Sequence, residues 1–288
     1  GFQQEGISPS VKDKIAIAKL LDDLGVHFIE GGWPGASPKE EEFFHRAKKE
    51  LKLKNAKLVS FGSTRKLNTT AEEDPQVKAL VEAGTEYVCI VGKSSNLHIT
   101  KAIETDVENA IKMAVDTIKY LKSNDKKVFF DAEHFFDGFK ENSEVSYKIL
   151  DAVLEEGVDC FIFCDTNGGT LPHEVTEILQ EVTTKHKKQK FGVHFQNDNG
   201  CAVPNSMAAV NLGVDHVQGT MNGYGERTGN ADLCTLIPNL TLKMEHETVP
   251  LKSLEKLTPI ANHIAELVNV SIDSRHPYIG SSAFTHKA

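Results

Sequence analysis

Short, bulky apolar runs recur along this chain at intervals of roughly 25 to 40 residues, which is the length of one strand–helix unit. Each run is almost continuously apolar, as is typical of a strand buried on both faces of a parallel sheet. The runs cover residues 26–30, 57–62, 86–91, 127–133, 159–164, 191–194 and 216–220. This repeat predicts an α/β chain built on a parallel sheet.

The segments between the runs have the periodicity of helices. From Val11 to Leu24, apolar side chains follow one helical face and charged ones the others. Four of the predicted helices end at a glycine that is followed at once by the next strand: Gly25, Gly84, Gly157 and Gly213. A glycine just past a helix can adopt the left-handed conformation that satisfies the last carbonyls. The result is an alternation of strand and helix, for which right-handed crossovers are expected.

Two architectures remain open, because seven strands can form an open doubly wound sheet or most of a barrel. The glycine-rich dinucleotide loop of a doubly wound sheet is absent after the first run. We therefore predict an α/β fold, a (β/α)8 TIM barrel that lacks its first strand, with a short C-terminal helical extension. The expected boundaries are residues 1–243 for an N-terminally truncated catalytic barrel, and 244–288 for a helical linker and the start of a post-barrel subdomain.

Composition restricts the function classes. A net charge of -9 argues against general binding to nucleic acid or to an anionic membrane, since both require a basic face. No apolar run approaches the roughly 18 residues of a membrane span, and the first residues do not have the pattern of a signal peptide. The five cysteines are an odd number without tight spacing, so they predict neither a disulfide framework nor a zinc knuckle. We expect a reduced, cytoplasmic setting.

Polar residues follow several of the predicted strands, at the rim where barrel enzymes place their active sites. Glu133 directly follows a buried strand, where a carboxylate without a partner is costly. It is a candidate general base or a carboxylate beside a metal, and a structural salt bridge is the alternative. The glycine-rich loop 223–230 can bring backbone amides close to an anion, although such loops are common.

His194 and Gln196 alternate along one predicted strand, so their side chains point the same way. This spacing suits two ligands of one metal ion. Imidazole nitrogen binds zinc or manganese well, whereas the carbonyl oxygen of glutamine is a weak ligand. A histidine buried in the core for structural reasons is the alternative.

Longer motifs carry a resemblance over the whole chain. They read Glu-Gly-Gly-Trp-Pro-Gly at 30–35, Phe-Gly-Ser-Thr-Arg at 61–65, Asp-Ala-Glu-His-Phe-Phe-Asp-Gly at 131–138, Cys-Asp-Thr-Asn-Gly-Gly-Thr-Leu-Pro at 164–172 and Gln-Gly-Thr-Met-Asn-Gly-Tyr-Gly-Glu-Arg at 218–227. In this order they resemble the family of 2-isopropylmalate and homocitrate synthases, which has hydroxymethylglutaryl-CoA lyase as a more distant relative. The closest similarity is to the members that form citramalate.

The resemblance implies an acyltransferase that condenses acetyl-CoA with a 2-keto acid, here pyruvate, and hydrolyses the thioester. It implies a divalent metal (Mn, Mg or Zn) that polarises the keto carbonyl, and a base that removes a proton from the acetyl methyl group. The implied setting is isoleucine and leucine biosynthesis in the cytoplasm, and the implied assembly is a homodimer.

The resemblance also implies roles for particular residues. The catalytic positions of the family fall on Glu133 and His286, and its histidine usually enters the site of the partner subunit. The metal positions fall on His194, Gln196 and Asn230. The substrate-binding positions fall on Thr166, Gln3 and Arg65, and Thr166 matches the hydroxyl that binds the keto-acid carboxylate.

Two departures from the family pattern qualify these expectations. The family's first strand carries Asp-Thr-Thr-Leu-Arg-Asp before a glycine, and this chain begins at that glycine. Without that metal-binding Asp and that Arg, we expect these 288 residues by themselves not to catalyse condensation. The second departure is internal, because the family's His-x-His-Asn-Asp has glutamine at Gln196. The remaining alternatives are condensation of the 2-isopropylmalate type, cleavage of the hydroxymethylglutaryl-CoA lyase type, and a homologue impaired in catalysis that serves as a scaffold or regulator.

Overall fold

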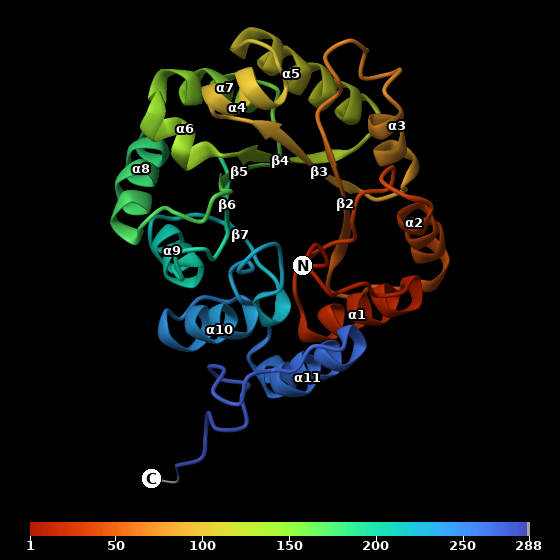
Figure 1. Cartoon of the computed structure of the whole chain (residues 1–288), viewed down its shortest axis with the longest axis vertical. Coiled ribbons are helices and arrows are strands. Elements are labelled where there is room, and N and C mark those ends of the chain that lie inside the picture. Colours follow the sequence, from red (N-terminus) through yellow and green to blue (C-terminus); the bar gives the residue numbers. More distant parts are fainter. Residues whose placement is uncertain (287–288) are drawn as a thin grey trace.

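The computed structural model describes residues 1–286 and has seven strands in one parallel sheet. The strands are β1 (Phe28–Glu30), β2 (Lys57–Ser63), β3 (Tyr87–Lys93), β4 (Lys127–Glu133), β5 (Cys160–Asp165), β6 (Phe191–Phe195) and β7 (His216–Gln218). Each strand pairs in parallel with the next in the chain, and the sheet curls into an open barrel (Figure 1). Within residues 1–286, β1 and β7 are not paired with each other. The predicted barrel with one strand lacking is therefore confirmed.

Helices form an outer ring around these strands (Figure 1). They are α1 (Val11–Leu24), α2 (Pro38–Glu50), α3 (Pro75–Glu82), α4 (Asn96–Ala102), α5 (Val107–Ser123), α6 (Phe135–Glu141), α7 (Ser143–Glu155), α8 (Pro172–Lys185), α9 (Ala202–Asn211), α10 (Leu233–Pro238) and α11 (Leu257–Val268), with the short turns η1 (Met221–Gly223), η2 (Asn239–Lys243) and η3 (Leu251–Lys256). Ile260 and Ile264 of α11 share a buried cluster with Ile17 and Leu24 of α1. The segment after α11 runs away from the barrel.

Local signals in the sequence explain where α1 begins and ends. The Ser10 hydroxyl accepts from the backbone N–H of Asp13 at 3.2 Å, while the Asp13 carboxylate accepts from the N–H of Ser10 at 2.9 Å. This reciprocal capping box satisfies two amides that the first turn leaves free. At the other end Gly25 has φ +97° and donates to the carbonyls of Leu21 and Asp22. The predicted left-handed glycines after helices are confirmed here and at 84, 157 and 213.

Aromatic side chains close the N-terminal end of the barrel interior. The rings of Phe28, Tyr87 and Phe129 meet with centroids 5.0 to 5.2 Å apart, and His216 packs 5.2 Å from Phe129. Burial lowers the pKa of His216 to about 4, so this imidazole is neutral at physiological pH.

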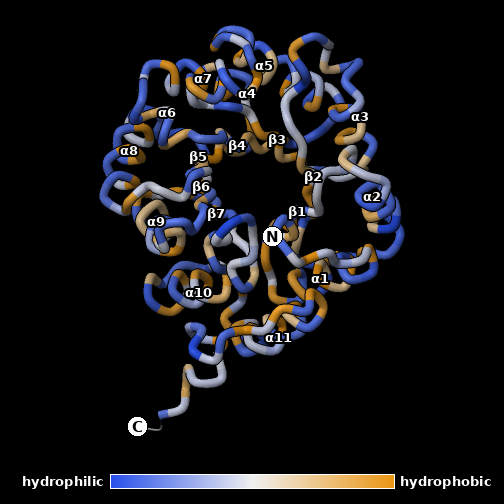
Figure 2. The backbone as a smooth tube through the Cα atoms, in the orientation of Figure 1, coloured by the Kyte–Doolittle hydropathy of each residue, from blue (hydrophilic) through white to orange (hydrophobic). Residues whose placement is uncertain are grey.

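Hydrophobic residues follow the strands and the sides of the helices that face them, and hydrophilic residues mark the outside of the ring (Figure 2). Among residues 1–286, no helix has both the length and the apolar character that crossing a membrane requires.

Candidate active site at the C-terminal rim

A cavity of about 1230 Å³ fills the open interior of the barrel and continues into the gap between β1 and β7. Of the predicted site residues, the cavity is lined by Gln3, Glu133, Thr166, His194, Gln196 and Asn230. Glu133, Thr166, His194 and Asn230 thus line one cavity, which brings together four different strand ends. This arrangement arises because parallel strands present all their carboxyl ends at one rim.

Two buried oxygens at this rim lack hydrogen-bond partners. Gln196 and Asn230 face each other across a short antiparallel bridge, and both residues are more than nine-tenths buried. The Asn230 amide nitrogen donates to the carbonyl of Tyr224 at 3.0 Å, which fixes the direction of its oxygen. Neither Gln196 Oε1 nor Asn230 Oδ1 has a partner within the described residues. Leaving such an acceptor buried and unmatched costs about 1–3 kcal/mol, and amide oxygens, although weaker ligands than imidazole, are among those that hard cations use.

His194 supplies a nitrogen donor beside these oxygens. Its Nδ1 lies 2.6 Å from Oε1 of Gln218, the residue paired with it on β7. That contact leaves Nε2 available to a ligand. One imidazole nitrogen and two amide oxygens therefore line the same cavity, and this donor set fits a divalent metal.

Glu133 ends β4 opposite Lys93, the last residue of β3, and the two side chains form an ion pair. The salt bridge that was the alternative for Glu133 is thus present, yet Glu133 still lines the cavity. The next residue, His134, has φ +60°, which is uncommon for a residue other than glycine. In this conformation its N–H donates to Thr166 Oγ1 at 2.9 Å. The Thr166 hydroxyl therefore accepts from the backbone and keeps its own proton for donation.

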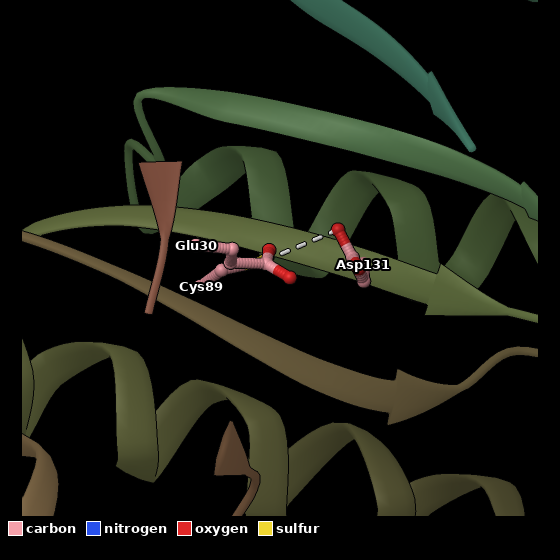
Figure 3. Close-up of side chains that lie close together, drawn as sticks. All are labelled: Glu30, Cys89 and Asp131. Atoms are coloured by element: carbon pink, nitrogen blue, oxygen red, sulfur yellow. Dashed lines mark hydrogen bonds between the residues drawn. The ribbon is translucent and has the colours of Figure 1, made fainter. Parts of the chain in front are cut away.

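Below this rim lies a cluster that the sequence analysis missed, formed by the buried Cys89 and Asp131 and by Glu30, which is exposed where it lines the cavity (Figure 3). Their ligand-type atoms all lie within 4.8 Å of one another, and the Cys89 thiol is 3.2 Å from Asp131 Oδ1. Burial raises the pKa of Asp131 well above its usual range, and the neighbouring Glu30 raises it further. The position of Glu30 inside the barrel, where it is partly shielded from bulk water, also raises its pKa, against the attraction of His194. Strand alternation was the available signal, since Asp131 shares a face with Glu133.

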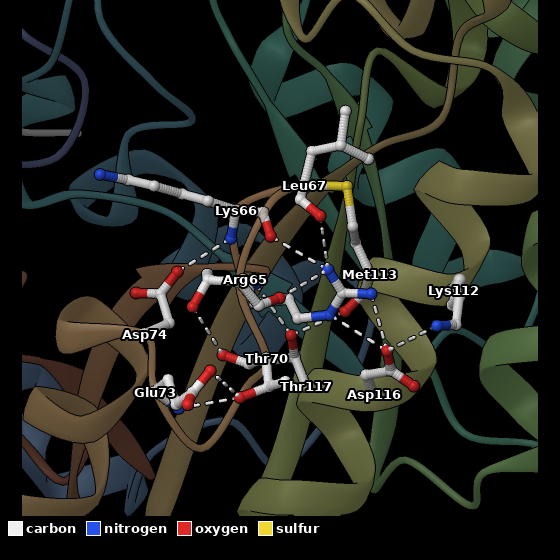
Figure 4. A network of polar contacts seen from close by, with 11 residues as sticks. Arg65, Lys66, Leu67, Thr70, Glu73, Asp74, Lys112, Met113, Asp116 and Thr117 are labelled. Carbon is white, nitrogen blue, oxygen red and sulfur yellow. Dashed lines mark hydrogen bonds and ion pairs between the residues drawn. The ribbon is translucent and has the colours of Figure 1, made fainter.

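Arg65, which the resemblance placed at the substrate, is committed to the protein itself (Figure 4). Its Nε and Nη2 donate to Asp116 Oδ2 at 3.1 and 2.7 Å. Its Nη1 donates to the carbonyls of Lys66, Leu67 and Thr69 at 3.0, 3.3 and 3.0 Å. Arg65 is 5% exposed and is not among the residues that line the cavity. The strand end that carries it turns outward toward α5, so we give Arg65 a structural role.

The other two predicted residues lie at the two ends of the chain. Gln3 belongs to the loop before α1, and it is exposed where it lines the cavity. His286 is exposed after α11, at the end of the described residues, and it does not line the cavity of its own chain.

The glycine-rich loop holds Asn230 in place, and part of its own backbone is hydrogen-bonded internally. The N–H groups of Gly223, Tyr224 and Gly229 donate to carbonyls of the same loop region. Arg227 donates to the Asp198 carboxylate at 2.8 and 2.9 Å, which lowers the pKa of Asp198. The suggestion that this loop binds an anion through its backbone amides therefore stays a prediction.

The parallel barrel, with candidate metal donors at its C-terminal rim, is consistent with what comparison with known proteins shows. The chain belongs to the HMGL-like family, whose sequence profile matches residues 1–262. The solved structure of HMG-CoA lyase from Bacillus subtilis superposes with a TM-score of 0.80 at 20% identity, covering 96% of this chain and 92% of that one. At that identity the likeness establishes the barrel fold alone.

Two curated relatives have a much higher sequence identity to this chain than that solved structure has. The chain is 51% identical over 287 residues to the (R)-citramalate synthase of Aquifex aeolicus and 46% identical over 288 residues to that of Streptomyces coelicolor. Both alignments cover all of this chain and 54% of the relative, so the chain spans about half the length of these relatives. The resemblance found in the motifs is confirmed.

Proposed function

We propose that this chain forms the catalytic barrel of an enzyme that condenses acetyl-CoA with pyruvate to give (R)-citramalate and CoA. The identity to (R)-citramalate synthases supports the choice of substrates. The observation that carries the chemistry is the pair of buried, unmatched oxygens on Gln196 and Asn230 beside His194. We place the barrel in residues 1–243 and the start of a post-barrel subdomain in 244–288, in a cytoplasmic homodimer that serves isoleucine and leucine biosynthesis.

In this proposal His194 Nε2, Gln196 Oε1 and Asn230 Oδ1 hold the divalent metal. The cation, when bound, polarises the carbonyl of the keto acid toward attack. Replacing one imidazole by an amide oxygen makes the donor set harder, which favours magnesium or manganese over zinc.

The side chains around that site divide the remaining work. Thr166 donates its hydroxyl proton to the keto-acid carboxylate, because its oxygen already accepts from the N–H of His134. Glu133 removes a proton from the acetyl methyl group, and the ion pair with Lys93 holds the carboxylate in place. The methyl carbon then bonds to the keto carbon as the carbonyl double bond opens, and the keto oxygen takes up a proton to become a hydroxyl group. Water cleaves the thioester to release CoA. The exposed position of His286 suits a role in the site of a partner subunit. Gln3 is placed to contact the substrate from the loop before α1.

The test is an assay of the full-length protein with acetyl-CoA and manganese. We expect thiol release with pyruvate and citramalate as its product. Thiol release only with a longer 2-keto acid would favour the 2-isopropylmalate type, and cleavage of hydroxymethylglutaryl-CoA would favour the lyase type. Failure to bind manganese or magnesium would overturn the proposed metal site and favour the impaired homologue.

A further inference from the structure

We propose that Gln218 is a positioning residue for His194. Asp131, across the barrel, fixes the orientation of the Gln218 side-chain amide, and the amide oxygen then holds the His194 imidazole in its Nδ1–H form. That form leaves the Nε2 lone pair free for a divalent cation. The inference rests on the proposed function, because it concerns how this chain prepares one of its metal donors.

A continuous chain of hydrogen bonds crosses the barrel interior. Gln218 Oε1 lies 2.6 Å from His194 Nδ1, and Gln218 Nε2 lies 3.1 Å from Asp131 Oδ1. Asp131 Oδ1 in turn lies 3.2 Å from the Cys89 thiol. These contacts join β6, β7, β4 and β3. Gln218 stands directly beside His194 in the sheet register, whereas Asp131 reaches it from across the barrel.

The direction of the Gln218 amide follows from its two neighbours. A carboxamide presents an acceptor on one side and donors on the other. Asp131 Oδ1 accepts from both the Cys89 thiol and the NH2 group of Gln218, so a proton that the raised pKa of Asp131 retains lies on its other oxygen and does not turn the amide around. Oε1 must then face His194, and the nitrogen that it contacts must carry the proton. The tautomer of a histidine is set by the bond that its other nitrogen makes.

This arrangement explains two polar residues that touch no proposed substrate. Metal-binding histidines usually donate their second N–H to a fixed acceptor, and losing that acceptor typically weakens metal binding by about 10–100-fold. Here the acceptor is a neutral amide rather than a carboxylate. A neutral amide can turn either its oxygen or its NH2 group toward His194. The hydrogen bond to Asp131, which is 4% exposed, fixes which of the two faces the imidazole.

The first test reads the tautomer in the metal-free, full-length protein. With ¹⁵N-labelled histidine, two-bond correlations distinguish the two neutral forms, and the His194→Asn variant identifies the signal of His194. We expect the Nδ1–H form in the wild type and a shift toward the Nε2–H form in Gln218→Met. A wild-type protein in the Nε2–H form would overturn the proposal, even if no variant folded.

The second test measures Mn²⁺ affinity by calorimetry in Gln218→Met, in Asp131→Leu and in the double variant. We expect each single variant to bind at least about 10-fold more weakly. If Asp131 acts through Gln218, the double variant should match Gln218→Met within about 2-fold, because the two effects are not independent. Cys160→Ala is the matched control, since Cys160 is equally buried on β5 but is outside the chain of contacts.

The outcomes separate the two proposals. Additive losses in the double variant, or unchanged affinity in Gln218→Met, would overturn the role of Gln218 while the metal site stood. A wild-type protein that binds no Mn²⁺ but keeps the Nδ1–H form would overturn the metal site and leave the positioning of His194 intact.

Discussion

Replacing Arg65 by methionine tests whether this arginine holds the protein together or binds substrate. The change keeps the length of the side chain and removes the whole guanidinium group. It leaves the carbonyls of Lys66, Leu67 and Thr69 without their donor. Asp116 keeps only the longer contact of 3.9 Å with Lys112. Each buried acceptor without a partner costs about 1–3 kcal/mol.

These costs do not simply add. The Asp116 side chain is 36% exposed, so its carboxylate regains water cheaply, and part of the loop can rehydrate. Removal of one partner of a buried ion pair typically destabilises a protein by about 3–5 kcal/mol. We expect a loss in this range from the free energy of unfolding, against a total of about 5–15 kcal/mol for a domain. Asp116→Asn keeps an acceptor oxygen at the same place and should cost about 1 kcal/mol.

Urea unfolding of the wild type and both variants measures these losses, and calorimetry on the folded proteins measures Mn²⁺ affinity. The structural role predicts a large loss of stability in Arg65→Met with unchanged Mn²⁺ affinity. Stability within about 1 kcal/mol of wild type, combined with a raised KM for the keto acid, would refute this reasoning and return Arg65 to the substrate site.

Three further predictions follow from the same structure. Glu133→Gln should lower kcat by about 10²–10⁴-fold with little change in KM, and steady-state rates close to wild type would remove Glu133 from the proton transfer. Gln196→His should raise affinity for zinc relative to manganese in paired titrations, and equal ratios would place residue 196 outside the metal site. His216 has a folded pKa of about 4, below its unfolded value of about 6.5, so its contribution to stability is complete above pH 6.5 and is lost as the pH falls toward 4. The free energy of unfolding should fall by about 2–3 kcal/mol over this range, less than full burial of the ring would give, because part of the ring faces the cavity. In urea unfolding, His216→Phe should show a smaller decline over the same pH range. Parallel declines in the two proteins would contradict this role of His216.

Local patterns in the sequence were sufficient for the architecture. Continuous apolar runs specify strands buried on both faces, and glycines such as Gly25 specify where helices stop, because both signals act over a few residues. Strand ends also predicted the convergence of Glu133 and His194, since a parallel barrel brings every carboxyl end to one rim.

The direction and partners of individual side chains were decided only by the tertiary structure. Arg65 follows a strand like the other rim residues, yet its side chain points outward because it forms an ion pair with Asp116 on α5, 51 residues further along the chain. In the sequence Gln218 is only one residue of a longer motif. Its proposed role in orienting His194 depends on a hydrogen bond to Asp131, 87 residues away across the barrel. Local periodicity carries no information about such contacts, because they exist only when the curled sheet brings distant strands face to face. The sequence thus determined the barrel and its rim, and packing across the barrel determined which of its polar groups can meet.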